Sequence, residues 1–555
     1  MSHSSFKLTL LAAGIVAATS ANAAIYDVHE VDAADYVAST ENYGVAIQKP
    51  VPLVGTGGCF ETDCGTGSAY AIAVETRNTE EAISYREEVP FAMDLSFSYV
   101  DDVNNSDDLE AYCFNERGYD TCEDWAKRKY VTWSKEYSDF TAYENAIAYV
   151  NGKVGTSATN TVVNGFVGIS STPFGNYSNT GAWAVGFGGG DFDLEPQSRV
   201  WFNDGTNIGG SISSKVSDGD KPYLYNSSKA ALQYSGDLIS LNWGRYDGDV
   251  SEEEDDRLAQ GSIRAIQDVG GIIYAVGFNT YRDQRSTNDI AATVFSIDPS
   301  AKDYTVASNW TYTRVSGTEN EISSDYTHSN SVVTDLNANL VAIGEAKRQG
   351  NAPENGAANN RLFYIADVSG SKTASFFSGG IFFNGAGGTA AAINNYNEVV
   401  GQIDAETSRE VDGKQRRTRG YINPLNANNT EPTRRAIFNN QAWLLDDLTN
   451  DGSTTSNNNQ YRIVSASDIN DDGVIAATAI KCTGGYDTTS HNAYCGGGNQ
   501  DETVVAVKLV PKIDDGSSDF TITARSTETP PVERSGGSLG FALLTVLGFL
   551  SFRRK

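Results

Sequence analysis

Short runs of β-branched and aromatic residues, separated by turn-forming residues, recur along most of the chain. Examples are RLFYIADV from Arg361, TVFSID from Thr293 and TVVAVKLV from Thr503, in which apolar and polar positions partly alternate. Successive side chains of a strand point to opposite faces, so this pattern is typical of strands of about four to eight residues with one face buried. The chain is therefore predicted to be mainly β.

A nine-residue pattern that combines a turn with a strand recurs along the chain. Its clearest copies are LNANLVAIG from Leu336, INNYNEVVG from Ile393 and INDDGVIAA from Ile469. Looser copies begin at three further positions, Ile147, Phe202 and Ile266. Asn followed two or three residues later by Gly or Asn favours the left-handed conformations of a tight turn, and the β-branched residues after it begin a strand.

The spacing of these copies predicts a repeat architecture. Successive copies begin 55 to 76 residues apart, which suits one four-stranded propeller blade of about 40 to 50 residues with added loops. Six visible units and one degenerate unit before Ile147 predict a β-propeller of about seven blades. A pair of β-sandwich domains, in which the same turn caps equivalent hairpins, is the alternative.

One region departs from the strand pattern. The sequence from Asp108 to Tyr137 favours helix, and Gly118 interrupts it. We expect a small helical insertion near residues 108–137, emerging from one face of the propeller. It is a candidate partner-binding surface, or alternatively a lid over one end of the barrel.

The six cysteines form three local pairs in the sequence. Because these pairs are widely separated, the simplest pairing in an oxidising compartment is three short-loop disulfides: Cys59 with Cys64, Cys113 with Cys122 and Cys482 with Cys495. Zinc binding is disfavoured, since no Cys-x-x-Cys spacing occurs and His491 is the only histidine close in sequence to a pair.

The N-terminus has the pattern of an exported protein. Lys7 precedes an apolar run from Leu8 to Ala18, and Ala21-Asn22-Ala23 follows. This order is typical of a Sec signal peptide cleaved between Ala23 and Ala24, and the apolar run is shorter than the ~20 residues that span a membrane. We expect the Sec machinery to export the chain and residues 1–23 to be removed.

The C-terminus carries a second processing pattern, in residues 535–555. Ser535, Gly536 and Gly537 precede an apolar stretch, and the chain ends in the cations Arg553, Arg554 and Lys555. An apolar helix with a basic end predicts a membrane segment whose basic end stays in the cytoplasm. The preceding residues 513–534 have the composition of a flexible spacer, which leaves residues 24–512 as the β-repeat domain.

This tail resembles the GlyGly-CTERM sorting signal of Gram-negative bacteria. The resemblance implies transient anchoring in the inner membrane and cleavage near the glycine pair by a rhomboid-type protease, the rhombosortase. It also implies sorting to the cell surface or release, in many cases after passage through the type II secretion system. A plain C-terminal membrane anchor is the alternative.

The charge of the chain limits its partners. It has 71 Asp and Glu against 41 Lys and Arg, a formal net charge of −30 over 555 residues. Such a surface repels nucleic acid and anionic lipid and attracts cations. Binding to nucleic acid is therefore excluded.

A calcium-binding pattern coincides with one copy of the repeat. Residues 468–473, DINDDG, fit D-x-[DN]-x-[DN]-G, in which oxygens at the first, third and fifth positions converge on Ca²⁺. The twelfth position is Ala479 instead of a bidentate Glu, which excludes an EF-hand. Asp468, Asn470 and Asp472 are therefore a candidate calcium site, with an acidic repeat turn as the alternative.

No catalytic constellation is recognisable in the sequence. It contains no HExxH, phosphate-loop or dinucleotide-binding motif, and the predicted mature chain has three histidines, His29, His328 and His491. The leading hypothesis is an exported, non-catalytic protein that binds a glycan, a matrix polymer or a protein, with 28 Tyr and 7 Trp available for stacking. The alternatives are a secreted polysaccharide hydrolase or lyase assisted by calcium, and an envelope structural protein that binds copies of itself.

The repeats resemble the HAF-type extracellular repeats of bacteria. The best match is Ala392-Ile393-Asn394 with Val399-Val400-Gly401. Together with the opening Tyr26-Asp27-Val28 and the C-terminal tail, they make the chain similar to DUF3466, a family of exported gammaproteobacterial proteins. This resemblance implies a location and a repeat architecture, and it implies no catalytic residues.

Overall fold

The computed structural model describes most of the chain between residues 24 and 527. The described ranges are 24–31, 41–50, 57–77, 105–115, 121–138, 146–151, 153–154, 161–179, 182–189, 192, 198–215, 226–245, 253–254, 257–283, 286–318, 331–347, 354–356, 360–408, 416–512 and 522–527. The predicted signal peptide and the predicted sorting tail lie outside these residues. Among the described residues, no helix is both long and apolar enough to cross a membrane.

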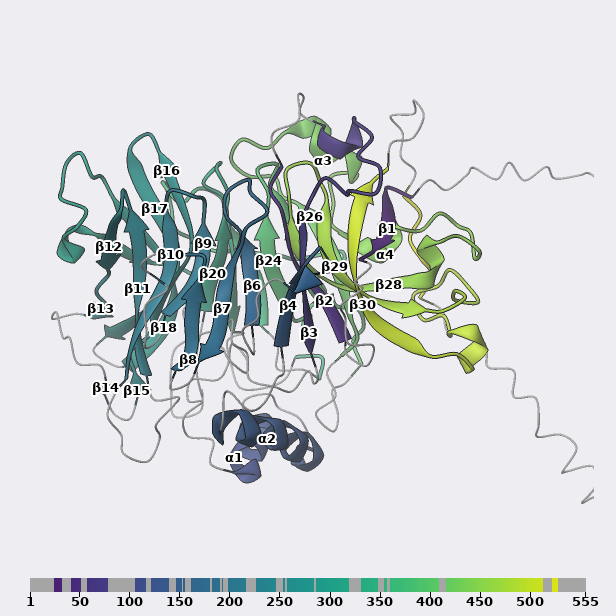
Figure 1. Cartoon of the computed structure of the whole chain (residues 1–555), viewed down its shortest axis with the longest axis horizontal. Coiled ribbons are helices and arrows are strands. Elements are labelled where there is room, and N and C mark those ends of the chain that lie inside the picture. The colour runs from purple at the N-terminus through teal and green to yellow at the C-terminus, as the bar shows by residue number, and fades with distance from the viewer. Residues whose placement is uncertain are drawn as a thin grey trace, which may run out of the picture.

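Seven antiparallel sheets form a seven-bladed β-propeller (Figure 1). The innermost strands of blades 1 to 7 are β2 (Glu41–Ile47), β6 (Thr161–Phe166), β9 (Ser198–Asn203), β16 (Gly261–Val269), β20 (Ser331–Leu336), β24 (Gly388–Ile393) and β28 (Tyr461–Ile469). The predicted propeller is confirmed, and the alternative of two β-sandwiches is wrong.

The remaining strands extend each blade outwards in chain order. They are β3 (Ile72–Arg77), β4 (Ala146–Val150) and β5 (Lys153–Val154) in blade 1, and β7 (Pro173–Asn179) and β8 (Ala182–Phe187) in blade 2. Blade 3 adds β10 (Ile208–Lys215), β11 (Asn226–Tyr234) and β12 (Asp237–Ser240), and blade 4 adds β17 (Ile272–Asp283), β18 (Ser286–Ile297) and β19 (Thr311–Arg314). Blade 5 adds β21 (Ala342–Lys347), β22 (Asn360–Ile365) and β23 (Ser375–Phe376), and blade 6 adds β25 (Glu398–Asp404), β26 (Thr418–Pro424) and β27 (Trp443–Leu444).

The last blade joins the two ends of the propeller domain. Its strands β29 (Ile475–Cys482) and β30 (Glu502–Pro511) follow β28, and the outermost strand is the N-terminal β1 (Tyr26–Glu30). Tyr26 pairs with Pro511 in an antiparallel register that runs to Glu30 opposite Val507. Strand pairing between β1 and β30 therefore closes the ring.

Smaller elements decorate the blades. Strand β13 (Gly244–Arg245) pairs in parallel with β17, and β14 (Glu253–Glu254) pairs with β15 (Arg257–Leu258). Helices α1 (Ser106–Asn115) and α2 (Glu123–Ser138) occupy the predicted insertion and lie on one face of the disc (Figure 1). Two short helices, α3 (Pro432–Ile437) and α4 (Leu445–Leu448), belong to blade 6, and short 3₁₀ turns lie at Gly58–Phe60, Ala307–Asn309, Asn458–Gln460 and Gly496–Gly498.

All three predicted disulfides are present. They join Cys59 to Cys64, Cys113 to Cys122 and Cys482 to Cys495, and no cysteine is left free. The second bond links α1 to the residue just before α2. With every thiol oxidised, cysteine is not available as a zinc ligand.

Most copies of the sequence repeat occupy one structural position. The copies at Phe202, Ile266, Leu336, Ile393 and Ile469 each connect the innermost strand of a blade to the second strand. The loose copy at Ile147 is instead the hairpin between the outer strands β4 and β5, so its assignment to the repeat is wrong. The resemblance there reflects only a tight turn between two short β segments.

Candidate binding cavity

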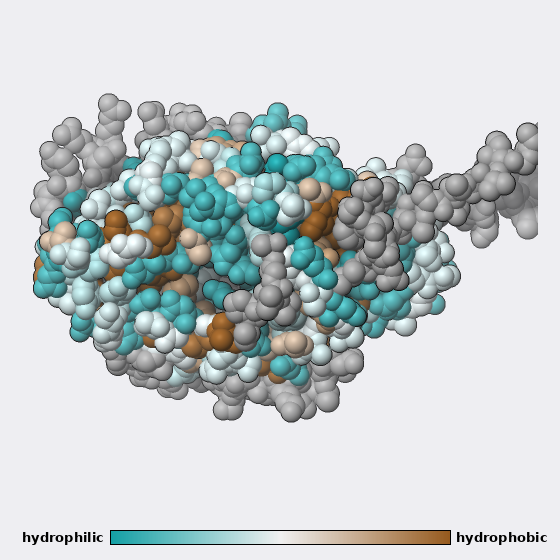
Figure 2. Space-filling view, turned by 90° about the horizontal axis from the view of Figure 1, so that it is seen from above, coloured by the Kyte–Doolittle hydropathy of each residue, from teal (hydrophilic) through white to brown (hydrophobic). Residues whose placement is uncertain are grey.

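The innermost strands of all seven blades surround a central cavity of about 890 Å³. This volume lies within the range of about 300 to 1,000 Å³ that is usual for small-molecule sites. Viewed from above, the molecule gathers hydrophilic residues around the middle of the face that Figure 2 shows. The cavity is therefore the leading candidate for a binding site.

Each innermost strand carries a β-bulge whose extra residue lines the cavity, and β28 has a second bulge, at Val464, that does not line it. The strand register skips this residue when the innermost strand pairs with the second strand. A bulge interrupts the alternation of a strand and re-aims a side chain. These seven residues, here named the bulge ring, are Val45, Asn164, Trp201, Arg264, Thr334, Ala391 and Ser467.

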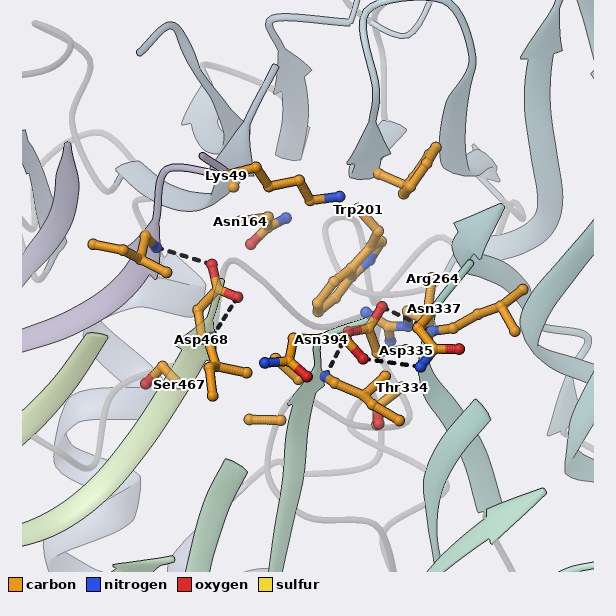
Figure 3. A pocket seen from close by; sticks show the side chains of 18 of the residues that line it. Lys49, Asn164, Trp201, Arg264, Thr334, Asp335, Asn337, Asn394, Ser467 and Asp468 are labelled. Carbon is orange, nitrogen blue, oxygen red and sulfur yellow. Dashed lines mark hydrogen bonds between the residues drawn. The ribbon is translucent and has the colours of Figure 1, made fainter. Parts of the chain in front are cut away.

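Trp201 and Arg264, from neighbouring blades, form the most distinctive pair in the bulge ring. The Arg264 guanidinium carbon lies 3.3 Å from the centroid of the Trp201 ring and 5.5 Å from that of Phe278. Arg264 is only 6% exposed, so water screens this cation–π contact weakly. Figure 3 shows the indole directed into the cavity, with Asn164 and Lys49 on a neighbouring wall.

Two carboxyl groups follow bulge-ring residues in blades 5 and 7 and occupy equivalent positions. Asp335 accepts hydrogen bonds from the backbone N–H of Leu336 at 2.8 Å and from that of Ile393 in the next blade at 2.9 Å. Asp468 does the same with Ile469 at 2.8 Å and with Ile47 of blade 1 at 2.9 Å. Each carboxyl group therefore links two blades and also lines the cavity (Figure 3).

Both carboxyl groups bind protons more tightly than usual. Burial raises the pKa of Asp335, against the opposing effect of its two N–H bonds. Burial also raises the pKa of Asp468 to about 7, and the negative charge of Asp335 contributes to this increase. Lys49 acts in the opposite direction on both groups. Near neutral pH, Asp468 is therefore divided between its protonated and ionised forms.

The asparagine of the repeat links neighbouring blades. The Nδ2 of Asn337 donates to the carbonyl of Asn394 at 2.9 Å, and that of Asn394 donates to the carbonyl of Asn470 at 3.1 Å. The series ends in blade 1, where Asn470 donates to the carbonyl of Gln48 at 3.1 Å. The left-handed residue of each turn comes three positions after the asparagine, at Leu340, Asn397 and Gly473, with φ of 61°, 61° and 86°.

The candidate calcium ligands have separate partners in the fold. Asp468 lines the cavity, and the Oδ1 of Asn470 accepts from the Val474 N–H at 3.0 Å within its own turn. Asp472 accepts from the Tyr70 hydroxyl at 2.8 Å. Across the part of the chain that the structure describes, no three His, Cys, Asp or Glu side chains are grouped as a metal site. The placement does not favour calcium at this turn, and calcium binding stays a prediction.

The histidines lie elsewhere. His29 is on the outermost strand β1, and His328 lies outside the described residues. His491 contacts Asp446 and Asp447 away from the cavity.

Comparison with known proteins identifies the family. A family model described as "Protein of unknown function (DUF3466)" matches residues 215–555, more than half of the chain. The chain belongs to the DUF3466 family. The matched region of this DUF3466 protein begins at the end of β10 and includes blades 4 to 7. It therefore contains the bulge-ring residues Arg264, Thr334 and Ser467.

Two further comparisons complete this result. No curated protein matches the DUF3466 protein. It is similar to a solved structure of a BT0996 RGII complex, with 13% sequence identity and a TM-score of 0.24, over 60% of this protein and 90% of the other.

Proposed function

We propose that this protein is a non-catalytic binding protein whose central cavity holds a neutral, polyhydroxylated ligand of the carbohydrate class. The observation that carries the proposal is the position of Trp201, an aromatic ring within a cavity wall of amides and hydroxyls. An aromatic face packs against the C–H face of a sugar ring, while the surrounding polar groups bond its hydroxyls.

The polar groups around Trp201 suit ligand hydroxyls because most can both donate and accept hydrogen bonds. They come from six blades and include Asn164, Asn203, Gln267, Thr334, Thr389, Asn394, Gln402, Ser465 and Ser467. An asymmetric set of this kind can distinguish the orientation of a ligand, although the backbone around it is pseudo-symmetric.

The charges of the lining support a neutral ligand. The cations Lys49 and Arg264 are outnumbered by six carboxyl groups: Asp204, Asp268, Asp335, Glu345, Asp468 and Asp471. The raised pKa values of Asp335 and Asp468 reduce this negative charge without reversing it. Such a lining disfavours anionic ligands.

We further propose that the protein acts outside the cytoplasm, at the cell surface or after release. The three disulfides support this location, because such bonds persist mainly in oxidising compartments. The predicted signal peptide and GlyGly-CTERM-like tail point the same way, through the Sec machinery and a rhomboid-type sorting protease.

The first test is binding of neutral oligosaccharides to the purified protein, screened on an array and then titrated by calorimetry. Replacing Trp201 with Ala should weaken binding about tenfold or more, as expected for an aromatic contact worth about 1.4 kcal/mol. Trp443→Phe is the matched control, because Trp443 lies on the outer strand β27, away from the cavity. Binding that is unchanged in Trp201→Ala, or no binding to any neutral oligosaccharide at millimolar concentration, would contradict the proposal.

A second candidate is a polysaccharide hydrolase or lyase. It is favoured by the presence of Asp335, Asp468 and Tyr43 around one cavity, because carboxyl groups with raised pKa values can act as general acids. Mass spectrometry of the bound oligosaccharide distinguishes the two functions. Shortened products that disappear with Asp468→Asn would establish catalysis, and an intact ligand after long incubation would support binding alone.

A further inference from the structure

Residues 522–527 follow the last strand and return to the surface of blades 6 and 7. We name these six residues the C-terminal strap. They pair with no strand, and Ile522 packs against the hydrophobic core of the last blade. The strap is held instead by groups of the underlying blades, independently of the central cavity.

Hydrogen bonds with the underlying blades hold the strap backbone. The N–H of His491 donates to the Ser526 carbonyl at 2.8 Å, and the N–H of Arg525 donates to Asp447 Oδ1 at 2.7 Å. Two side-chain amides also donate to the strap backbone, Asn450 to the Thr523 carbonyl and Asn492 to the Thr527 carbonyl, both at 3.0 Å. Backbone capture of this kind binds an extended segment and contributes little to its sequence specificity.

The side chain of Arg525 supplies the sequence specificity that the backbone contacts lack. It is 4% exposed, and its guanidinium enters a pocket of oxygen acceptors. Nε donates to the Asp446 carbonyl at 2.6 Å, and Nη1 donates to the Thr489 carbonyl at 2.9 Å and to Asn459 Oδ1 at 3.3 Å. Several acceptors arranged around a planar fork recognise arginine in a way that lysine cannot match.

The floor of this pocket is a buried network of paired charges. Asp446 lies 2.9 Å from Arg419 Nε and 3.4 Å from His491 Nδ1, and Asp447 lies 3.1 Å from His491 Nε2. Burial alone would raise the pKa of Asp446, but His491 and Arg419 hold it well below its usual range. The Asp446 carboxylate therefore stays ionised and attracts a cationic side chain.

The groove is organised by contacts that do not involve the strap. Asn459 Nδ2 donates to the carbonyls of Thr454 and Tyr486, and Asp446 accepts the N–H of Ile463 at 2.7 Å. Undocking the strap breaks no strand pairing. A recognition surface that is built separately from its occupant can exchange that occupant.

We propose that this groove is a peptide-recognition site for an extended segment with a buried arginine, and that the C-terminal strap occupies it reversibly. Docking fixes the position of Thr527 on the propeller. Gly536 comes nine positions after Thr527 in the sequence, so a chain of that length can place the glycine pair of the predicted sorting tail at most about 30 Å from Thr527 while the strap is docked.

The test uses the full-length protein and a fluorescent peptide with the sequence of residues 520–529. In the Arg525→Ala protein the resident strap is weakened, so the labelled peptide should bind at least tenfold more tightly than it binds the native protein. A peptide that carries Arg525→Ala should show no such gain. Lys512→Ala is the control, because Lys512 is half-exposed and makes a long contact of 3.7 Å with Asp27.

Hydrogen exchange at the Arg525 amide provides a second measurement in case Arg525→Ala unfolds. In Arg525→Lys, which keeps the positive charge, this amide should exchange at least tenfold faster while the amides of β30 keep their native rates. If both peptides bind Arg525→Ala equally, or if strap and β30 exchange together, the strap is an integral part of the blade and the proposal is wrong.

Discussion

Gly473, in the turn between β28 and β29, combines an unusual backbone with a crowded position. Its φ is +86°, and an added Cβ would collide with the Phe60 ring and lie 2.9 Å from Arg434 Nη2. Gly270 also has a positive φ, +64°, but open space surrounds it. We expect Gly473→Ala to lower the free energy of unfolding by about 3 kcal/mol and Gly270→Ala by about 1 kcal/mol, because only the first adds overpacking to backbone strain. Urea denaturation measures both values, and equal losses would show that crowding at Gly473 has no cost.

Asp468 should make the stability of the propeller depend on pH. Its pKa is raised in the folded protein to about 7, so between about pH 4 and 7 the folded state binds more protons than the unfolded state. This contribution to stability is complete below about pH 4, declines as pH rises through the window and is absent above about pH 7. Because the cavity leaves the side chain partly accessible, solvent weakens the effect. We therefore expect the free energy of unfolding to change by about 1 to 2 kcal/mol across this pH range, less than for a carboxyl group shielded from water.

The comparison that isolates this effect is urea denaturation of the native protein and Asp468→Asn at pH 4.5, 6 and 8. The variant has no titrating group at this position, so its stability relative to the native protein should improve as pH rises. Asp237→Asn, on the exposed outer strand β12, controls for the loss of one carboxyl group. A stability difference that stays constant from pH 4.5 to 8 would show that Asp468 titrates normally.

At the scale of the elements, the strands and the turns between them could be predicted from the sequence, whereas the bulges could not. Asn337, Asn394 and Asn470 could be recognised because the same local hydrogen bonds recur in blades 5, 6 and 7. Their role in joining blades could not, because each acceptor belongs to another repeat. Local disulfides were predictable for the corresponding reason: both partners of each pair are close in sequence.

The candidate site was less accessible to sequence analysis than the fold. A bulge depends on the register between two strands, so nothing in the residues around Trp201 or Arg264 marks them as cavity-lining. The equivalence of Asp335 and Asp468 was available from the aligned repeats, where each aspartate precedes the apolar residue that opens the copy. The sequence analysis singled out Asp468 as a candidate calcium ligand, and not as a cavity-lining carboxyl group that joins two blades. The Arg525 pocket and its floor assemble residues from 419 to 525 and have no contiguous motif.

At the scale of the whole molecule, the propeller depends on one junction between its ends. Val28 of β1 is 1% exposed, faces Leu509 in the register with β30 and donates its N–H to Asn458 Oδ1 at 3.0 Å. Val28→Ala should lower the free energy of unfolding by about 2 kcal/mol through the lost methyl groups and the cavity that remains. Val269→Ala, at an exposed hairpin of blade 4, should cost less than about 0.5 kcal/mol.

Hydrogen exchange shows whether that loss opens the ring at the junction. If β1 acts as the closure, Val28→Ala should speed exchange of the β30 amides more than that of the β17 amides in blade 4, because detachment of β1 exposes β30 and leaves distant blades paired. Equal acceleration in both strands would mean that the seven blades unfold as one cooperative unit. The junction would then stabilise the whole ring without being its weakest point, since no blade could open while the others stayed closed.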